Sequence, residues 1–168
     1  MTVHTTIDSP LGRLLLVGER SATAPGGTAL VSLSVPGQKG GAVVQDGWRE
    51  DAGAFTEIVS QLRAYFDGER TRFHIECVVG GTDFQRRVWE ALETIPYGTT
   101  VSYGDIARQI GAPRTAVRSV GTAIGRNPLL IVRPCHRVIG ASGALTGYAG
   151  GLERKERLLV HEGALQSA

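Results

Sequence analysis

The sequence predicts an α+β protein of two small domains, residues 1–79 and residues 80–168. Three observations lead to this prediction. Strand-like segments separated by glycine- and proline-rich turns fill the first half. Helix-start and helix-end signals dominate the second half, and the pair Gly80-Gly81 lies between the two patterns. A chain of 168 residues has room for one ordinary domain or for two small ones.

The first half predicts strands and one helix. Residues 5–19, "TTIDSPLGRLLLVGE", alternate loosely around a Pro-Leu-Gly turn, which is typical of a β-hairpin. The segments 28–35, "TALVSLSV", and 72–79, "RFHIECVV", are further strand candidates. Apolar residues from Phe55 to Phe66 recur at helical spacing, and the glycine two residues later ends an amphipathic helix.

Two capping boxes mark helix starts in the second half. Thr82 is followed three residues later by Gln85, and Pro96 ends the helix that they begin. Ser102 and Asp105 repeat the pattern in "SYGDIARQI". In both boxes the first side chain accepts from the backbone at the helix start and the second reaches back to it.

A second short helix, 114–125, follows "SYGDIARQI" after a turn that contains Gly111. Two short helices joined by a tight turn predict a helix-turn-helix, although such pairs also occur in proteins that never bind DNA. The chain is then expected to run extended through 129–132 to Cys135, and residues 152–162 to form a last helix.

Charge is distributed unevenly along the chain. The net charge is +2, but the two halves carry −2 (residues 1–81) and +4 (residues 82–168). From Arg108 to Arg137 there are six arginines and no acidic residue. Arginine binds phosphate better than lysine does, so this run favours an anionic partner. The alternative is a plain solvated surface.

Several classes of protein are excluded. The hydrophobic content of 42% and the charged content of 20% are those of a globular protein. No apolar run reaches the length of a membrane span, and the start of the chain does not resemble a signal peptide, so we expect a cytoplasmic protein. Two distant cysteines predict free thiols, and no Cys/His spacing suggests a metal site.

The stretch "RPCHR" places a lone cysteine, Cys135, before a histidine. A thiol becomes a nucleophile when a base or a positive field favours its thiolate. Adjacent side chains point apart on a strand, so a contact between Cys135 and His136 needs a turn or a bridging water. Glu162 could orient the imidazole. The alternative is a cysteine packed in the core beside an ordinary histidine.

The motif "PCHRVIG" resembles the active-site signature of the O6-alkylguanine-DNA alkyltransferases. The segments "TTIDSPLG", "GTDFQRRVWEALETIPYGTTVSYGDIA", "NPLLIVRPCHRV" and "SGALTGYAGGLERKERLLVHEG" resemble the same family in the same order. The likeness covers most of residues 1–12 and 80–163, whereas residues 19–52 give no comparable support.

The resemblance implies an N-terminal α/β domain with an antiparallel, RNase H-like sheet. It implies a C-terminal, mainly helical domain with a winged-helix-like helix-turn-helix. The implied function is direct-reversal DNA repair, in which the alkyl group of O6-alkylguanine, and also of O4-alkylthymine, is transferred irreversibly to the protein in a single turnover. No cofactor or metal is implied. The implied partner is double-stranded DNA bound by a monomer, with cooperative binding left open.

The resemblance also implies roles for five residues. Cys135 is the acceptor nucleophile, His136 its base through a water, and Glu162 the group that fixes the histidine tautomer. Asn127 braces the turn before the active site. Tyr103 helps to protonate the leaving guanine.

The target base is expected to leave the stack through the minor groove, with an arginine taking its place. Alignment on "VG" makes Arg118 this finger, and Arg114 is the alternative because "GAPRTAVRSVG" is one residue longer than the family pattern. The expected base pocket comprises Val138, Tyr148, Ala149, Ile124 and Lys155. The expected DNA-side residues, besides Arg118 and Tyr103, are Gly104, Ala112, Ala116, Gln85, Arg126 and Ala141.

Arg133 departs from the family, which usually has an aliphatic residue there. It is expected either to add positive field near the thiolate or to reach a phosphate, unless it is simply a surface residue. Three rival functions remain: an alkyltransferase-like lesion sensor, a helix-turn-helix regulator and a Cys-His hydrolase. Cys135 argues against the first, and the number of transfers per molecule separates all three.

Overall fold

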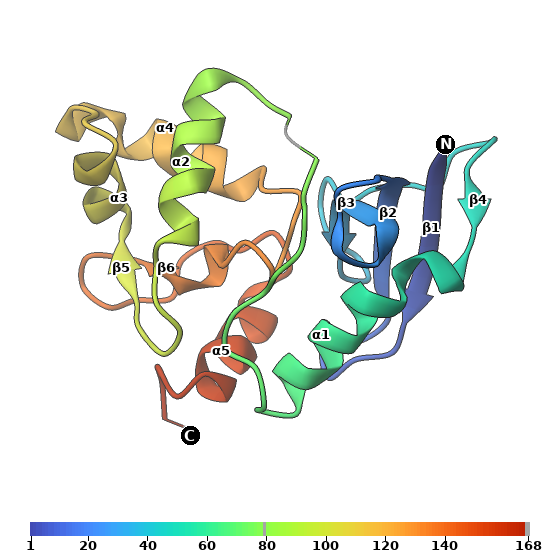
Figure 1. The fold of residues 1–168 in the computed structure, drawn as a ribbon. Helices are drawn as coiled ribbons and strands as arrows, with labels where there is room; N and C mark the ends of the chain where they lie inside the picture. Colours follow the sequence, from blue (N-terminus) through green and yellow to red (C-terminus); the bar gives the residue numbers. More distant parts are fainter. Residues whose placement is uncertain (79, 167–168) are drawn as a thin grey trace. The chain divides into compact units, whose positions relative to one another are not determined.

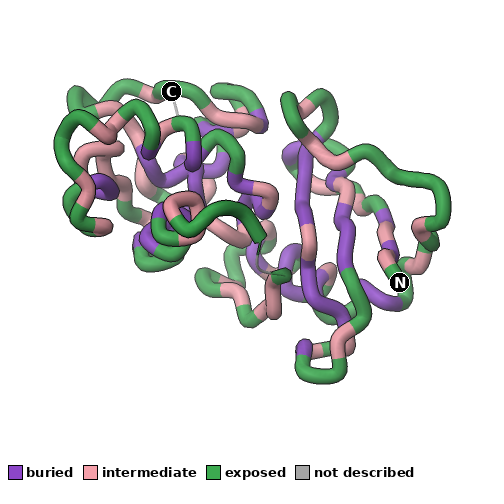
Figure 2. The backbone as a smooth tube through the Cα atoms, turned by 90° about the horizontal axis from the view of Figure 1, so that it is seen from above, coloured by how far each residue is buried: buried purple, intermediate pink, exposed green. Residues whose placement is uncertain are grey.

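The computed structural model describes residues 1–78 and 80–166, and the chain divides into two compact units, Met1–Val79 and Gly80–Ala168. Figure 1 shows strands and one long helix in the first unit and mainly helices in the second. In Figure 2 the exposed residues lie mostly along the outer loops, and buried ones follow the strands and helices. No helix among the described residues is long and apolar enough to cross a membrane.

The first unit is built on a sheet with the order β3-β2-β1-β4. Its strands are β1 (Thr2–Ile7), β2 (Leu14–Arg20), β3 (Thr28–Ser34) and β4 (Arg49–Glu50). The pairs β1/β2 and β2/β3 are antiparallel, as the hairpin pattern predicts, and the short β4 joins β1 in parallel. The register of β2 against β3 shifts at Val17/Gly18. A Cβ at Gly18 would lie 2.8 Å from the carbonyl oxygen of Ala29, which explains the glycine.

One helix packs on this sheet. The short 3-10 helices η1 (Pro25–Gly27) and η2 (Ala52–Phe55) precede β3 and α1 (Thr56–Phe66) respectively. Ile58, Leu62 and Tyr65 of α1 are buried, so the predicted amphipathic face is the one that enters the core.

The prediction of a strand over residues 72–79 is wrong for the part that is described, and residue 79 lies outside it. Only one isolated bridge, Leu30 with Cys77, joins this segment to the sheet. At His74 a side chain takes the place of a neighbouring strand: Gln61 exchanges two hydrogen bonds of 2.8 Å with the backbone of this residue. Backbone groups that are satisfied in this way are not available to a ladder.

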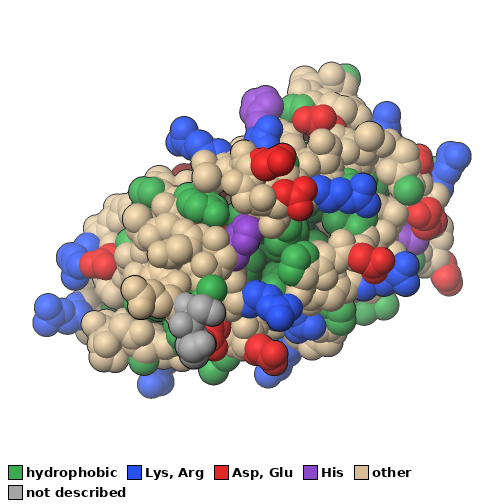
Figure 3. Space-filling model, turned by 90° about the horizontal axis from the view of Figure 1, so that it is seen from below, with side chains coloured by type: hydrophobic (Ala, Val, Ile, Leu, Met, Phe, Trp, Pro, Cys, Tyr) green, Lys and Arg blue, Asp and Glu red, His purple; other side chains and the backbone are tan. Residues whose placement is uncertain are grey.

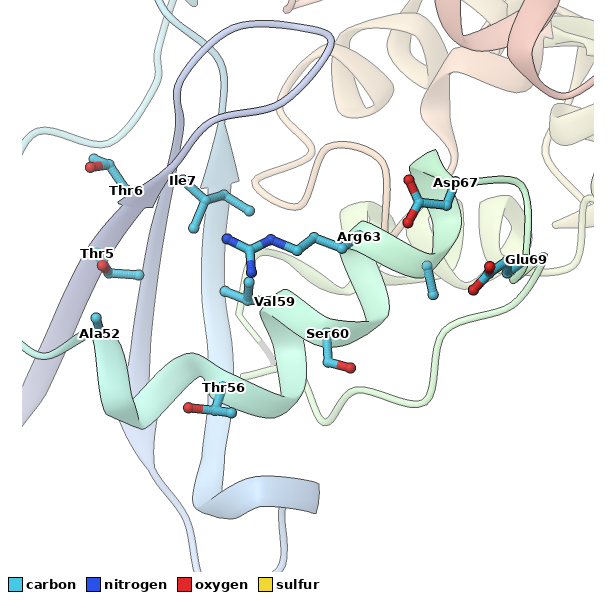
Figure 4. A pocket seen from close by; sticks show the side chains of 11 residues that line it. Thr5, Thr6, Ile7, Ala52, Thr56, Val59, Ser60, Arg63, Asp67 and Glu69 are labelled. Atoms are coloured by element: carbon cyan, nitrogen blue, oxygen red, sulfur yellow. The ribbon is translucent and has the colours of Figure 1, made fainter.

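A cavity of about 600 Å³ lies between β1 and α1 in the first unit. Figure 4 shows Arg63 extending from α1 toward Ile7 of β1, with its guanidinium beside Ile7 and Val59. None of the predicted site residues lines this cavity.

The second unit contains four helices and two short strands among its described residues. The elements are α2 (Asp83–Glu93), β5 (Val101–Ser102), α3 (Tyr103–Gln109), η3 (Arg114–Ala116), α4 (Val117–Gly125), η4 (Cys135–Arg137), β6 (Val138–Ile139) and α5 (Leu152–His161). Strands β5 and β6 pair in parallel. Helices α3 and α4 form the predicted helix-turn-helix.

Both predicted capping boxes are present. The Thr82 and Ser102 hydroxyls accept from the backbone of Gln85 and Asp105, whose side chains accept from the two cap residues in return. The core of the unit is sealed by apolar side chains of every helix, and Trp89 of α2 donates its indole N–H to the Ala123 carbonyl of α4 at 2.9 Å. This bond fixes the helix-turn-helix against α2.

Candidate active site

The segment that leads from α4 to Cys135 is a compact turn, which corrects the prediction of an extended run through 129–132. The backbone N–H of Arg133 donates to the carbonyl of Leu129 at 3.0 Å, and Ile131 has a φ of 72°. A β-branched residue rarely adopts positive φ, so other contacts must hold this turn closed.

Asn127 supplies those contacts. Its Nδ2 donates to the carbonyls of Arg133 (3.0 Å) and Leu129 (3.3 Å), and its Oδ1 accepts from the Leu129 N–H (3.0 Å). A side-chain amide carries both a donor nitrogen and an acceptor oxygen, so this one residue can bond to both ends of the turn. Asn127 is itself 2% exposed. The turn therefore delivers the chain to η4 in one defined direction.

Cys135, His136 and Arg137 all lie on the single turn of η4, and all three are buried. A 3-10 helix has three residues per turn, so consecutive side chains leave it in three directions. Of the two arrangements left open by the sequence, a turn and a bridging water on a strand, the structure has the turn. On this turn Cys135 faces a cavity, while the side chains of His136 and Arg137 meet Glu162 at the end of α5.

The cavity beside Cys135 has a volume of about 500 Å³, within the range of small-ligand pockets. It lies entirely within the second unit, between α3, α4, η4 and the loop before α5. Its lining residues are Tyr103, Arg118, Gly121, Ile124, Gly125, Cys135, Thr146, Gly147, Tyr148 and Ala149. The structure therefore brings six of the predicted site residues to one cavity.

Behind the cysteine, Glu162 binds two neighbours at once. Its Oε2 lies 2.8 Å from Nε2 of His136, and Arg137 donates from Nε to Oε1 (2.7 Å) and from Nη2 to Oε2 (2.9 Å). Glu162 is 5% exposed and His136 is fully buried. A buried carboxylate needs such partners, because burial of an unpaired charge is very costly.

Burial lowers the pKa of His136, and the positive charges of Arg137 and Lys155 lower it further, although Glu162 acts in the opposite direction. The imidazole is therefore neutral at pH 7. Its carboxylate partner assigns the proton to Nε2, which leaves the lone pair on Nδ1. Nδ1 is buried and has no hydrogen-bond partner among the described residues.

Burial raises the pKa of the Cys135 thiol to about 11, while a hydrogen bond with Asn127 and the charges of Lys155 and Arg133 act to lower it. Lys155 is fully buried, and burial lowers its own pKa to about 8. Its Nζ donates to the carbonyls of Thr146 (2.8 Å) and Gly147 (3.3 Å). Lys155 thus carries charge toward the thiol and also ties down the loop that lines the cavity.

Two tyrosines face this cavity with different hydroxyl environments. The Tyr103 hydroxyl accepts a hydrogen bond from Thr146 at 3.0 Å. The Tyr148 hydroxyl is buried and has no partner among the described residues. A Cβ at Gly150 would lie 2.7 Å from the Tyr148 ring, so this glycine allows the ring its position. The cavity wall therefore holds one satisfied and one unsatisfied phenol.

Other predicted residues lie away from the cavity lining. Val138 pairs with Val101 in the two-stranded sheet, and Gln85 caps α2. Gly104 belongs to α3, and the remaining DNA-side residues lie at or near the exposed surface of turns and helix ends: Ala112, Ala116, Arg126 and Ala141. Arg114 and Arg118 are both exposed, but only Arg118 lines the cavity. On the face drawn in Figure 3, basic and acidic side chains are interspersed.

The ion pair between Arg137 and Glu162 was not predicted from the sequence, which showed Arg137 only as a positive charge near Cys135. An arginine next to the motif gives no sign of burial before the turn is known.

Arg133 is neither a plain surface residue nor free to reach outward. Its side chain is 11% exposed, lies 5.0 Å from the Trp89 ring and bonds Asn127 Oδ1 at 3.3 Å.

No cluster of three or more potential metal ligands occurs among the described histidine, cysteine and acidic residues. The groups that the site brings together are a buried thiol, a neutral imidazole and a carboxylate, beside a cavity of small-ligand size.

Two family matches cover most of the chain. Residues 2–77 match the family described as 6-O-methylguanine DNA methyltransferase, ribonuclease-like domain. Residues 83–164 match 6-O-methylguanine DNA methyltransferase, DNA binding domain. The two matches follow one another in the order of the two units.

Similar whole proteins are known from mycobacteria. A methylated-DNA--protein-cysteine methyltransferase of Mycobacterium tuberculosis (strain H37Rv) is 54% identical over 162 residues, which cover 96% of this chain and 93% of the relative. Its counterpart from Mycolicibacterium paratuberculosis is 53% identical with the same coverage. The crystal structure of Mycobacterium tuberculosis OGT in complex with DNA matches with a TM-score of 0.86 and 52% identity, covering 96% of this chain and 93% of that one. These matches confirm the predicted fold class.

Proposed function

Because the chain belongs to the 6-O-methylguanine DNA methyltransferase family, as its motifs suggest and its matches over residues 2–77 and 83–164 establish, we propose that Cys135 is the residue that accepts the alkyl group. The protein is a methylated-DNA–protein-cysteine methyltransferase that repairs DNA by alkyl transfer to a cysteine. The observation that supports Cys135 is its position: it lines the 500 Å³ cavity and has the His136–Glu162 pair behind it. The second cysteine, Cys77, lies in the other unit.

The reaction is a displacement at carbon. The Cys135 thiol gives its proton, through a water, to Nδ1 of His136, and the thiolate sulfur forms a bond to the alkyl carbon. The bond from that carbon to guanine O6 breaks, and its electron pair stays on the base. The Tyr103 hydroxyl gives a proton to the base and is reprotonated through solvent, to which His136 returns the proton it took from the thiol, so the products are a thioether and neutral guanine. No cellular thiol reverses a thioether, and each molecule acts once.

The substrate base enters the cavity after leaving the duplex stack. The base leaves the stack through the minor groove, and the Arg118 side chain of α4 fills the gap that it leaves. The support for Arg118 over Arg114 is that Arg118 lines the cavity rim while Arg114 does not. Tyr148 and Ile124 form apolar walls, and the N–H of Ala149 points to O6.

Double-stranded DNA is the partner of this protein, in keeping with the related mycobacterial enzyme that was crystallised in complex with DNA. We extend the substrate class to O6-alkylguanine in general and to O4-alkylthymine, and we expect a monomer that acts without a cofactor. Helix α4 is the recognition element, and the six arginines between 108 and 137 supply part of the positive field.

Transfer from an oligonucleotide duplex that carries O6-[methyl-³H]methylguanine tests this function. Label on the wild-type protein should level at about one methyl per chain, and Cys135→Ser should acquire none while Cys77→Ser behaves like the wild type. Repeated turnover would indicate a hydrolase. Binding of the lesion without transfer would indicate a sensor. If Cys77→Ser, which still has Cys135, acquired no label, the assignment of Cys135 would be refuted.

A further inference from the structure

The guanidinium of Arg137 is buried and fully hydrogen-bonded. Arg137 is 6% exposed, and each nitrogen of its guanidinium has a bond. Nε and Nη2 donate to the two oxygens of Glu162 at 2.7 and 2.9 Å, and Nη1 donates to the carbonyl of Ile95 at 2.6 Å. The guanidinium also lies 5.7 Å from the ring centre of Tyr97.

We propose that Arg137 is a positioning residue for alkyl transfer, which acts through Glu162 to hold His136 as a neutral imidazole with Nδ1 free to receive the Cys135 proton. This inference rests on the proposed function, since it gives Arg137 a part in the reaction at Cys135. It concerns a residue that touches neither the cavity nor the thiol.

The geometry of the carboxylate supports this role. Glu162 Oε2 is shared by His136 Nε2 (2.8 Å) and Arg137 Nη2 (2.9 Å), while Oε1 is bound by Arg137 Nε. A bidentate pair of this kind fixes the plane of the carboxylate. The carboxylate therefore presents one lone pair to the imidazole at a fixed angle, which fixes the tautomer and the ring orientation.

Charge balance supports it as well. With Arg137 present, the negative charge of Glu162 is already matched, and His136 can rest without a proton. With Arg137 removed, the buried carboxylate would favour an imidazolium beside it, because an opposite charge stabilises a buried ion. An imidazolium has no lone pair left for the Cys135 proton.

The other ionisable groups that surround His136 act in known directions. Glu162 raises the pKa of His136, whereas burial, Arg137 and Lys155 lower it. Tyr97, packed against the guanidinium, has a pKa raised by burial and by Glu162, so it stays neutral at pH 7. Arg137 donates two hydrogen bonds to the carboxylate that His136 binds, and its removal should therefore raise the pKa of His136.

Single-turnover rates of methyl transfer from pH 5 to 9 test the proposal in the full-length wild type, Arg137→Gln, Arg137→Lys and a control, Arg63→Gln. Arg63 is exposed on α1 and belongs to the other unit. We expect Arg137→Gln to move the acid limb of the profile upward by about 1 to 3 pH units, the size of effect that a nearby charge has on a pKa. Arg137→Lys keeps the charge and should restore the limb at a lower plateau.

The titration of His136 by NMR gives a readout that does not depend on transfer, and it should show the same upward movement in Arg137→Gln. An acid limb and a His136 titration that both stay in place would overturn the role of Arg137, even if the rate fell at every pH. If Arg137→Gln does not fold, the Arg137→Lys profile decides. This variant keeps the positive charge, so an acid limb that moves upward by about 1 to 3 pH units in it would contradict the proposal. Failure of the wild type to transfer methyl would refute the proposed function instead, and the NMR comparison would still decide the effect of Arg137 on His136.

Discussion

The Nε2 atom of His136 lies 2.8 Å from Oε2 of Glu162, although the two residues are 26 positions apart and come from η4 and the end of α5. Both side chains are closed off from solvent. The last helix of the chain thus completes the environment of a motif that precedes it, and the stability of the fold and the chemistry of the site depend on the same contact.

Glu162→Gln should destabilise the protein by about 3–5 kcal/mol, because the variant leaves the buried Arg137 without a carboxylate. Urea unfolding measures this change. The matched control is Glu156→Gln, the same substitution at an exposed position of the same helix, which should change the free energy of unfolding by less than about 0.5 kcal/mol. Equal effects at the two positions would show that the Arg137 pair contributes no stability.

Stability should depend on pH through His136. Its pKa is lower in the folded protein than the ordinary 6.5, so below about pH 6.5 the unfolded chain takes up a proton that the folded protein does not. The unfolded state then binds more protons, and stability falls as the pH falls. The free energy of unfolding of the wild type minus that of His136→Gln, measured in urea from pH 5 to 8, should therefore rise with pH up to about 6.5 and then level. A difference that is flat over this range would contradict the lowered pKa.

Arg118→Ala should slow methyl transfer from duplex DNA by at least about tenfold and transfer from a single-stranded oligonucleotide much less. The reason is that base flipping from a duplex costs a few kcal/mol, which an inserted side chain offsets, whereas a single strand has no stack to break. Arg114→Ala is the matched control on the same side of the turn. The reverse ranking of the two variants on duplex DNA would make Arg114 the finger.

Tyr148→Phe should leave the stability of the free protein unchanged or raise it by up to about 1 kcal/mol, because the hydroxyl is buried without a partner among the described residues. Tyr103→Phe removes a hydroxyl that Thr146 binds at 3.0 Å, and it should cost about 0.5–1.5 kcal/mol. Thermal and urea unfolding of both variants check the contrast. A loss of stability in Tyr148→Phe as large as that in Tyr103→Phe would argue against it.

The parts of the fold that follow from short-range signals could be predicted. Both capping boxes, at Thr82 and Ser102, were visible because the paired residues are three positions apart and satisfy each other's backbone. Over residues 72–78 the expected strand is reduced to one bridge with Leu30, and the backbone of His74 bonds to the Gln61 side chain, 13 positions away, instead of to a strand. β4, with only two residues, carries no periodicity to detect.

The site was predicted by motif rather than by geometry. The motif pointed to Cys135, His136 and Glu162, and the fold places His136 against Glu162 with Cys135 on the same 3-10 turn, whereas the extended run expected before Cys135 is a compact turn. The turn depends on the Asn127 side chain, a bracing role that the resemblance implied. The individual bonds, to residues up to six positions away, do not follow from a residue pattern.

The depth at which Cys135 is buried has a consequence for the time before the protein meets a lesion. With a pKa of about 11 and 3% exposure, only about one thiol in ten thousand is ionised at pH 7. Peroxides, disulfides and soluble electrophiles react with the thiolate, so a protonated and enclosed sulfur reacts with them slowly. For a protein that, as we propose, is consumed by one transfer, this slow side reaction would keep the sulfur available until a damaged base is met.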